Sequence, residues 1–410
     1  MESPAAASGP VLDPFEPGFF DDPYPQYARL RSEAPVHRTP FGPWALSRYD
    51  DCIRLLRDPG TSVEVGNADD ARRERIFAPD DPRDDRGTHA ILNLDPPDHT
   101  RIRRLVQKAF TPRQVEALHA RIDHLVEAAL DRVAPTGGMD VITDLAFPLP
   151  FEVISDLLGM PDTDREQIRD VAHTLAGVLE PLTPPEAADS LRAASDAMTH
   201  HVEAAIAWKR DRPADDLLSA LVAVEDDGDV LSPGELRDQV TLLYIAGHET
   251  TVNLIGNAMA TLLRHPDQLQ RLRDDPTLVN NAVEELLRFD GPVQFSRRIL
   301  LTDLEVGGQA LSAGTFVFTL LGAANHDPDH FGPDAESLDL GRRLAPQHLA
   351  FGGGIHHCLG AVLARAEARA ALGALVARFP GLALATGTDP LAWNGRLVLR
   401  GLDTLPVTFG

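Results

Sequence analysis

The stretch FGGGIHHCLG, residues 351–360, decides the fold of this chain, and it runs straight into the helix-like segment LGAVLARAEARAALGALVARF. Cys358 therefore stands just before a helix N-terminus, where unpaired N–H groups and the helix dipole favour a thiolate. The four glycines of the stretch leave room for a flat ligand beside the sulfur. A thiolate in such a turn suits a soft metal centre such as haem iron. The alternative, a buried structural cysteine, is disfavoured by the glycines and by the two neighbouring histidines.

The same stretch resembles the cysteine-ligand motif of the cytochrome P-450 family of haem-thiolate monooxygenases. Five residues match the family pattern without a gap: Phe351, Gly354, His356, Cys358 and Gly360. The resemblance continues in motifs from about residue 95 to residue 370. It implies a mainly α fold with a small antiparallel β region, in which haem b (iron protoporphyrin IX) lies between a long central helix and the cysteine loop. Cys358 is then the expected metal ligand.

Length and composition narrow the class of protein further. A chain of 410 residues would ordinarily suggest two or three domains. Because the motifs are far apart in sequence yet surround one haem in this family, we expect a single domain over residues 1–410. The net charge of −24 argues against nucleic acid or an anionic membrane as a partner. With only two cysteines, Cys52 and Cys358, no disulfide framework is possible, which favours a reducing, cytoplasmic location.

The N-terminal 20 residues contain prolines and acids but no basic region and no long apolar run. They predict an extended segment and neither a signal peptide nor a membrane anchor, as in the soluble, bacterial-type members of the family. Residues 60–94 form a charged, proline-punctuated stretch, which predicts a long loop of the kind that covers substrate sites. Helical patterns dominate from about 98 to 290, and a strand-rich stretch follows at 297–320.

A second motif, AGHETT, lies in the middle of an apolar helical pattern that begins near Pro233. A charged residue and β-branched polar residues disfavour such a helix, so they require a role or a partner. The Thr250 hydroxyl can bond the carbonyl of Ala246, four residues earlier, and bend the helix locally. The resemblance assigns Thr250 and Glu249 as the catalytic alcohol and acid that deliver protons to the oxygen-binding face of the haem. The alternative is a polar patch beside a crevice water.

Cationic side chains are needed for the two haem propionates. The segment DPPDHTRIRRL opens a helix and places His99 and Arg103 on one face of it. The resemblance assigns His99 and Arg103 to one propionate, and Arg298 and His356 as further propionate ligands. Each one alone could equally be a solvated surface cation. Histidines 326, 330 and 357 receive no such role, because a zinc site would need further ligands at suitable spacing.

The segment EELLR places Glu285 and Arg288 three residues apart on one helical face. In the family such a pair is completed by an arginine from the segment before the cysteine loop, here Arg342 or Arg343. Its expected role is in folding and haem retention rather than in catalysis.

The resulting hypothesis is a monooxygenase that hydroxylates or epoxidises a small, largely apolar organic substrate with O2. Its electrons would come from NAD(P)H through a ferredoxin reductase and an acidic ferredoxin. The ferredoxin would dock on the Cys358 side through a local basic patch, against a net charge that otherwise repels it. The arginines of this patch are Arg101, Arg104, Arg113, Arg342, Arg343, Arg365 and Arg369. The expected substrate contacts are Phe77, Leu242, Ile245, Ala246, Val293 and Phe295.

Three alternatives remain open from the sequence. One is a peroxide-driven peroxygenase on the same fold, and another is a haem-binding sensor without turnover. The intact pair of Glu249 and Thr250 argues against both. The third is a helical enzyme without haem, which the colour of a purified sample would settle.

Overall fold

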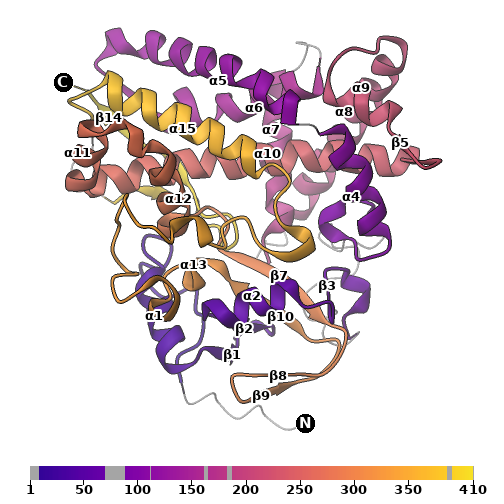
Figure 1. The fold of residues 1–410 in the computed structure, drawn as a ribbon, viewed down its shortest axis with the longest axis vertical. Coiled ribbons are helices and arrows are strands. Elements are labelled where there is room, and N and C mark those ends of the chain that lie inside the picture. The colour runs from indigo at the N-terminus through magenta and orange to yellow at the C-terminus, as the bar shows by residue number, and fades with distance from the viewer. Residues whose placement is uncertain are drawn as a thin grey trace.

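The computed structural model describes residues 9–69, 88–110, 112–160, 165–181, 187–385 and 390–409. A helix-rich part with α5, α6, α10 and α15 occupies the upper half of Figure 1, and a strand-rich part with α1, α2 and the main sheet lies below it. The principal helices are α1 Tyr24–Glu33, α2 Tyr49–Arg57, α4 Asp98–Ala109, α5 Pro112–Val133, α6 Pro148–Leu158, α7 Arg165–Leu175, α8 Ala188–Asp211, α9 Leu217–Ala223, α10 Pro233–Arg264, α11 Pro266–Asp274, α12 Val279–Asp290, α13 Leu321–Ala324, α14 Pro328–Phe331 and α15 Ala361–Arg378. This mainly helical architecture with small sheets is the one predicted.

The strands are β1 Val36–Arg38, β2 Trp44–Leu46, β3 Thr61–Ser62, β4 Gly138–Asp140, β5 Glu225–Asp226, β6 Asp229–Val230, β7 Phe295–Leu300, β8 Leu304–Val306, β9 Gln309–Leu311, β10 Phe316–Leu320, β11 Ala383–Leu384, β12 Ala392–Trp393, β13 Leu402–Thr404 and β14 Pro406–Thr408. Five of them form the main sheet in the order β1-β2-β10-β7-β3. In it β10 pairs antiparallel with β7, opposite Arg298 at Val317, and parallel with β2. The predicted strand region at 297–320 is thereby confirmed, and it fixes the position of Arg298.

The central helix α10 begins where its capping sequence predicts. The Ser232 hydroxyl accepts a hydrogen bond from the N–H of Glu235, and the Glu235 carboxylate accepts one from the N–H of Ser232. Pro233 occupies the first turn, where its missing N–H costs nothing. The helix runs for 32 residues and packs against α6, α12 and α15, so most of its surface is buried. In its middle, His248, Glu249 and Thr251 therefore lie inside the protein.

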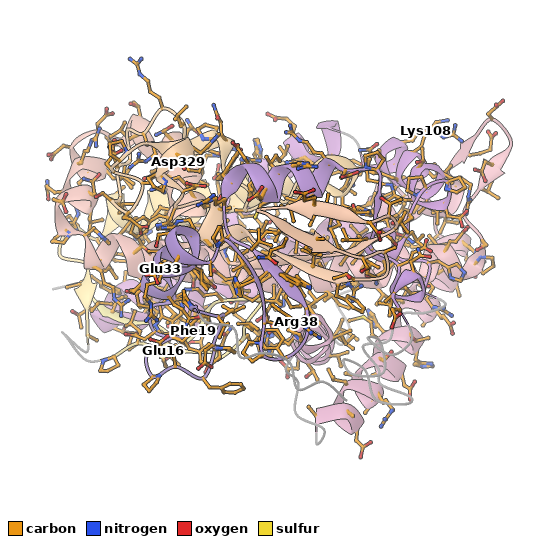
Figure 2. The ribbon with its side chains drawn as sticks, turned by 90° about the horizontal axis from the view of Figure 1, so that it is seen from below. Glu16, Phe19, Glu33, Arg38, Lys108 and Asp329 are labelled. Atoms are coloured by element: carbon orange, nitrogen blue, oxygen red, sulfur yellow. The ribbon has the colours of Figure 1, made fainter. Side chains whose placement is uncertain are left out.

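The N-terminal segment packs against the protein. Residues 14–21 form turns, and Leu12 and Phe19 are buried in a cluster with Tyr27 of α1. Figure 2, which views the molecule from below, shows Glu16 and Phe19 close to α1, whose last residue is Glu33. The apolar side chains among the prolines explain why this segment packs against the protein.

The predicted loop at 60–94 is described only at its two ends. Residues 60–69 contain β3 and the short helical turn η1, Val65–Asn67, and the second end contains η2, Ile91–Asn93. Residues 70–87, including Phe77, lie outside the described residues. Separately, none of the helices in the described ranges has both the length and the apolar content needed to cross a membrane.

Candidate functional site

Cys358 lies between the short helical turn η9, Gly354–His356, and the start of α15. Its N–H donates to the carbonyl of Phe351 at 3.0 Å, which closes the loop. Gly354 has φ +67°, and a Cβ at this position would lie 2.3 Å from the carbonyl oxygen of Leu56. Glycine is therefore required there for both conformation and space. The loop makes the turn beside Cys358 that the glycines of the motif predict.

The Cys358 thiol is subject to opposing influences. Burial raises its pKa, whereas the N–H groups of Gly360 and Ala361 and the cations Arg103 and Arg365 act to lower it. The helix N-terminus and the two arginines do not outweigh burial, so the pKa of the Cys358 thiol is raised, and the expectation that this turn by itself favours the thiolate is not met. A bound metal ion would complete the stabilisation of the thiolate, because a coordinating thiol loses its proton.

Four cationic or donor side chains gather beside Cys358. The rings of His99 and His356 lie 4.3 Å apart, and Arg103 donates through Nη2 to the carbonyl of His357 at 2.7 Å. Burial, together with the nearby His99, Arg298 and Arg103, lowers the pKa of His356 to about 3. The structure therefore brings together all four predicted propionate ligands from α4, β7 and the cysteine loop.

The described residues offer these side chains few hydrogen-bond acceptors. Arg298 is buried, and burial lowers its pKa to about 10. Its Nη1 donates only to Ser296 Oγ and to the carbonyl of Arg297, and His99 Nε2 is buried with no hydrogen-bond partner among the described residues. Asp95 attracts Arg298 and His99 without a hydrogen bond to either among the described residues. Buried cations that lack a bonded carboxylate are costly, so the cluster fits an anionic ligand such as two haem propionates. When bound beside a cysteine thiolate, haem iron supplies dioxygen activation.

The AGHETT motif lies within α10, which continues through it as a regular helix. Thr250 Oγ1 donates to the carbonyl of Ala246 at 2.7 Å, as its spacing predicts. His248 is fully buried, and its Nε2 donates to the carbonyl of Phe147 at 3.0 Å. Burial lowers the pKa of His248 to about 4, so this imidazole is neutral. Ala246 and Thr250 keep exposed surface, whereas His248 and Glu249 point into the protein.

Glu249 has two partners that the sequence did not indicate. His173 Nδ1 of α7 lies 2.8 Å from Oε2, and Arg396 Nη1 donates to Oε1 at 2.7 Å. Burial acts to raise the pKa of Glu249, but His173 and Arg396 outweigh it, so the pKa is lowered. The carboxylate is therefore ionised at neutral pH and held from two sides. Both partners lie far from Glu249 in sequence, and neither belongs to a recognisable motif.

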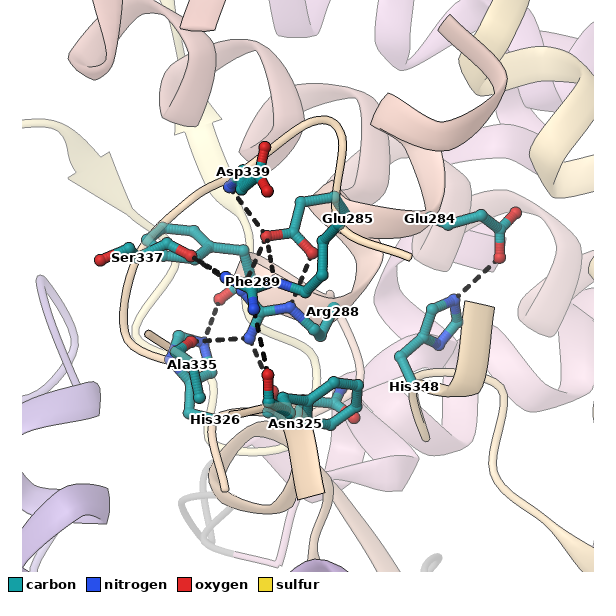
Figure 3. A network of polar contacts seen from close by, with 12 residues as sticks. Glu284, Glu285, Arg288, Phe289, Asn325, His326, Ala335, Ser337, Asp339 and His348 are labelled. Atoms are coloured by element: carbon teal, nitrogen blue, oxygen red, sulfur yellow. Dashed lines mark hydrogen bonds and ion pairs between the residues drawn. The ribbon is translucent and has the colours of Figure 1, made fainter. Parts of the chain in front are cut away.

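The pair in EELLR is completed by Arg342, not by Arg343. Figure 3 shows Arg288 against Glu285 with its remaining N–H groups on backbone carbonyls. Arg342 Nε donates to Glu285 Oε1 at 3.1 Å, and Arg342 is buried, whereas Arg343 is exposed. The choice between the two arginines is thereby settled.

The neighbouring Glu284 forms a second cluster behind the cysteine loop. Arg365 donates to both oxygens of Glu284, at 2.6 and 2.9 Å, and its guanidinium carbon lies 4.4 Å from the centroid of the Phe351 ring. His348 Nε2 lies 3.3 Å from Glu284 on the other side (Figure 3). Arg365 therefore braces the first residue of the loop that carries Cys358.

These contacts correct the predicted basic patch. Arg342 is buried, Arg365 is paired with Glu284, and Arg101 is paired with Glu235 and Asp229. Arg343 is exposed, and Arg104 is exposed but lies 3.9 Å from Asp229. Arg369 donates to Asn280, and the side chain of Arg113 lies outside the described residues. Glu367, on the same helix as Arg365 and Arg369, is buried, and burial raises its pKa.

The expected substrate contacts divide into two groups. Leu242, Ile245 and Val293 are partly exposed, as lining residues would be. Phe295 is buried and packs with Phe318 at 6.0 Å between ring centroids, which makes it a core residue. No group of histidine, cysteine and carboxylate side chains in the described part of the chain could hold a metal ion by itself.

Comparison with known proteins agrees with this geometry. A sequence model described as "Cytochrome P450" matches residues 55–399. Cytochrome P450 107B1 of Saccharopolyspora erythraea is 42% identical over 414 residues, 98% of each chain, and the cytochrome P450 monooxygenase PikC of Streptomyces venezuelae is 43% identical over 411 residues, 98% of this chain and 95% of that one. The crystal structure of CalO2 has a TM-score of 0.89 at 35% identity and covers 98% of this chain and 99% of its own.

The fold and the site define a haem-thiolate protein. The chain belongs to the cytochrome P450 family. It is a monooxygenase, an oxidoreductase that incorporates molecular oxygen into its substrate. The family also implies the haem-thiolate cofactor that the residues around Cys358 fit.

Proposed function

We propose that this enzyme hydroxylates or epoxidises a largely apolar organic molecule, with Cys358 as the ligand of haem b. The observation that carries the proposal is the convergence of His99, Arg103, Arg298 and His356 beside Cys358. Asp95 attracts Arg298 and His99, but no carboxylate among the described residues forms an ion pair with any of the four. These four side chains would hold the haem propionates. We further propose that residues 1–410 form one domain around this cofactor.

Thr250 and Glu249 would manage protons on the opposite side of the cofactor from Cys358. The Thr250 hydroxyl keeps exposed surface and donates to the carbonyl of Ala246, so its oxygen remains able to accept a hydrogen bond. Glu249 is ionised and can accept a proton at either oxygen once His173 or Arg396 moves. Thr250 and Glu249 are adjacent residues of α10, which supports a shared role.

The electrons would come from NAD(P)H through a ferredoxin reductase and an acidic ferredoxin that docks on the Cys358 side. Ile355 and Val362 flank Cys358 in sequence and are 50% and 59% exposed, unusual for large apolar side chains. The Arg104 side chain is 54% exposed. An apolar centre with cations at its rim suits a transient partner of opposite charge.

The substrate class follows from the partly exposed apolar residues and from the relatives. One relative is named vitamin D(3) 25-hydroxylase, from Pseudonocardia autotrophica, and another is 6-deoxyerythronolide B hydroxylase, from Saccharopolyspora erythraea. A related structure contains testosterone. We therefore propose a substrate of macrolide or steroid size with few charged groups.

The test begins with the purified protein and its Cys358→Ser variant. Wild type should contain haem and give the red-shifted Soret band of the ferrous carbon monoxide complex, and the variant should lose that band. A variant that retained it would refute the assignment.

Vitamin D3, testosterone and 6-deoxyerythronolide B are then screened for the spin-state change caused by loss of the iron's water ligand. A positive compound is incubated with ¹⁸O2, NADPH, ferredoxin and reductase, and incorporation of one labelled atom is expected. Product formed only with hydrogen peroxide would indicate a peroxygenase instead.

A further inference from the structure

Glu180 makes an unusual set of contacts with the backbone of a distant segment. It follows η5, Ala176–Leu179, and its carboxylate is buried. Oε2 accepts the N–H of Leu397 at 2.8 Å, Oε1 accepts that of Leu399 at 2.9 Å, and the N–H of Val398 lies within 3.2 Å of both oxygens. One side chain therefore binds three consecutive backbone N–H groups, 217 to 219 residues away.

The segment from 396 to 399 is fixed on its other sides as well. Arg396 is bonded to Glu249 of the central helix. The carbonyl of Val398 accepts the N–H of Gln294, and Leu399 forms an isolated bridge with Val293. The segment thus lies between Glu180 and the stretch that leads into β7.

Glu180 satisfies N–H groups that the short bridge leaves without a strand partner. Buried N–H groups require an acceptor, and a carboxylate gives stronger hydrogen bonds than a neutral group. Burial raises the pKa of Glu180, whereas the three N–H groups and Arg396 act to lower it. Without this carboxylate, the backbone of residues 397–399 would need water or another conformation.

We infer that Glu180 is a positioning residue for substrate selection, which fixes the backbone of residues 397–399 against Val293 and Gln294. Val293 is partly exposed and is one of the proposed substrate contacts, so the placement of its partner Leu399 sets the wall of the site there. The inference rests on the proposed function for its substrate, but the order of the segment can be measured without any turnover.

The first test measures hydrogen–deuterium exchange of the haem-loaded enzyme at residues 397–399. Glu180→Ala should speed exchange of all three N–H groups at least about tenfold, because exchange reports local opening. Glu180→Gln keeps one carbonyl oxygen and replaces the other with an amide that cannot accept. It should therefore release one of the two outer N–H groups, of Leu397 or Leu399, more than the other. Glu116→Gln is the matched control, since the Glu116 side chain is 78% exposed on α5.

The second test uses imidazole and 4-phenylimidazole as iron ligands. Glu180→Ala should change the Kd of 4-phenylimidazole at least about fivefold, because the phenyl ring reaches the wall of the site, and leave that of imidazole within about twofold. Haem content and the carbon monoxide spectrum should match those of wild type, which separates this result from failure of the haem-thiolate assignment. Unchanged exchange at 397–399 in both variants would overturn the inference. Faster exchange with an unchanged ratio of the two Kd values would overturn the role in selection.

Discussion

Arg342 Nε lies 3.1 Å from Oε1 of Glu285, and both side chains are buried with Arg288 on the other side of the same carboxylate. One negative charge is thus shared by two guanidinium groups, and the remaining N–H groups of Arg342 bond to the carbonyls of Phe331, Asp334 and Ser337 and to the Asp334 carboxylate. The cluster connects α12 to the segment that precedes the cysteine loop. Loss of Arg342 would remove the donor of the Phe331 carbonyl and one of the two cations on Glu285, whereas the carbonyls of Ser337 and Asp334 keep other donors.

Replacing Arg342 with Met should therefore destabilise the protein by about 1.5–3 kcal/mol, the usual contribution of hydrogen bonds to a charged group, because Glu285 keeps its pair with Arg288. We expect lower haem content and a lower urea midpoint. Arg343→Met is the matched control, because Arg343 is exposed and should behave as wild type within about 0.5 kcal/mol. Equal loss of stability in both variants would contradict the assignment of Arg342.

Thr250→Ala should preserve haem content and substrate affinity but divert reducing equivalents to peroxide or water. The reason is that the hydroxyl beside the carbonyl of Ala246 is then missing where protons are needed. The measurement is product formed per NADPH consumed, in a system that contains ferredoxin and reductase.

Thr250→Ser is the matched variant for this experiment, since it keeps the hydroxyl and loses only a methyl group. It should restore most of the coupling. An alanine variant with the product yield of wild type would remove Thr250 from the proton pathway.

Glu284 leads to a prediction about acid stability. Burial acts to raise its pKa, but His348 and Arg365 outweigh burial and hold the pKa of Glu284 at about 2. A carboxyl whose pKa falls on folding stabilises the protein above its unfolded pKa of 4.5, and this contribution is lost as pH falls towards 2. Its size is of the order of 3 kcal/mol.

Glu284→Gln lacks the stabilisation that comes from the lowered pKa of Glu284. The difference in the free energy of unfolding between wild type and variant should therefore shrink as pH falls from 5 to 3. Urea unfolding of the haem-loaded proteins at each pH measures the difference. Glu116→Gln, at an exposed position, should show no such trend. A difference that stays constant over this range would mean that the pair of Glu284 and Arg365 does not titrate as proposed.

The sequence could predict contacts that are local or carried by a motif. The hydrogen bond from Thr250 to Ala246 follows from a spacing of four residues on a helix, and the capping of α10 follows from Ser232 and Glu235. The cluster of His99 with His356 was reached only through the family motifs, since these two residues are 257 positions apart. His99 Nε2 has no hydrogen-bond partner among the described residues, which fits the proposal that a haem propionate supplies its acceptor.

Other contacts could not be predicted because nothing local specifies them. His173 and Arg396 reach Glu249 across 76 and 147 residues, and each resembles an ordinary surface cation in its own segment. Arg342 and Arg343 are neighbours with the same chemistry, so only packing decides which of them is buried. Arg365 was assigned to the surface because its partner Glu284 is 81 residues away.

The exposed residues around Cys358 lead to a prediction about the electron donor. Replacing Val362 with Asp puts a negative charge on the proposed apolar centre, and replacing Arg104 with Glu reverses the charge of an exposed side chain on α4 that lies 3.9 Å from Asp229. Both changes should slow the first electron transfer from an acidic ferredoxin by about tenfold at low salt. The rate in wild type should also fall with added salt, because exposed charges are screened over about 8–10 Å. Stopped-flow reduction of the substrate-bound enzyme under carbon monoxide measures these rates.

Two controls separate docking from damage to the fold. Phe15→Asp alters another exposed apolar residue, 78% exposed in the N-terminal segment, and should leave the rate unchanged. Arg365→Glu should instead lower haem content and stability, because Arg365 braces Phe351 and neutralises Glu284. The contrary outcome is that ferredoxin reduces Val362→Asp and Arg104→Glu as fast as wild type, with a wild-type rate that does not change with salt. That result would mean that the ferredoxin does not dock at this surface. Because the substrate dissociation constant should be the same in wild type and both docking variants, a slower rate can be assigned to the encounter with ferredoxin.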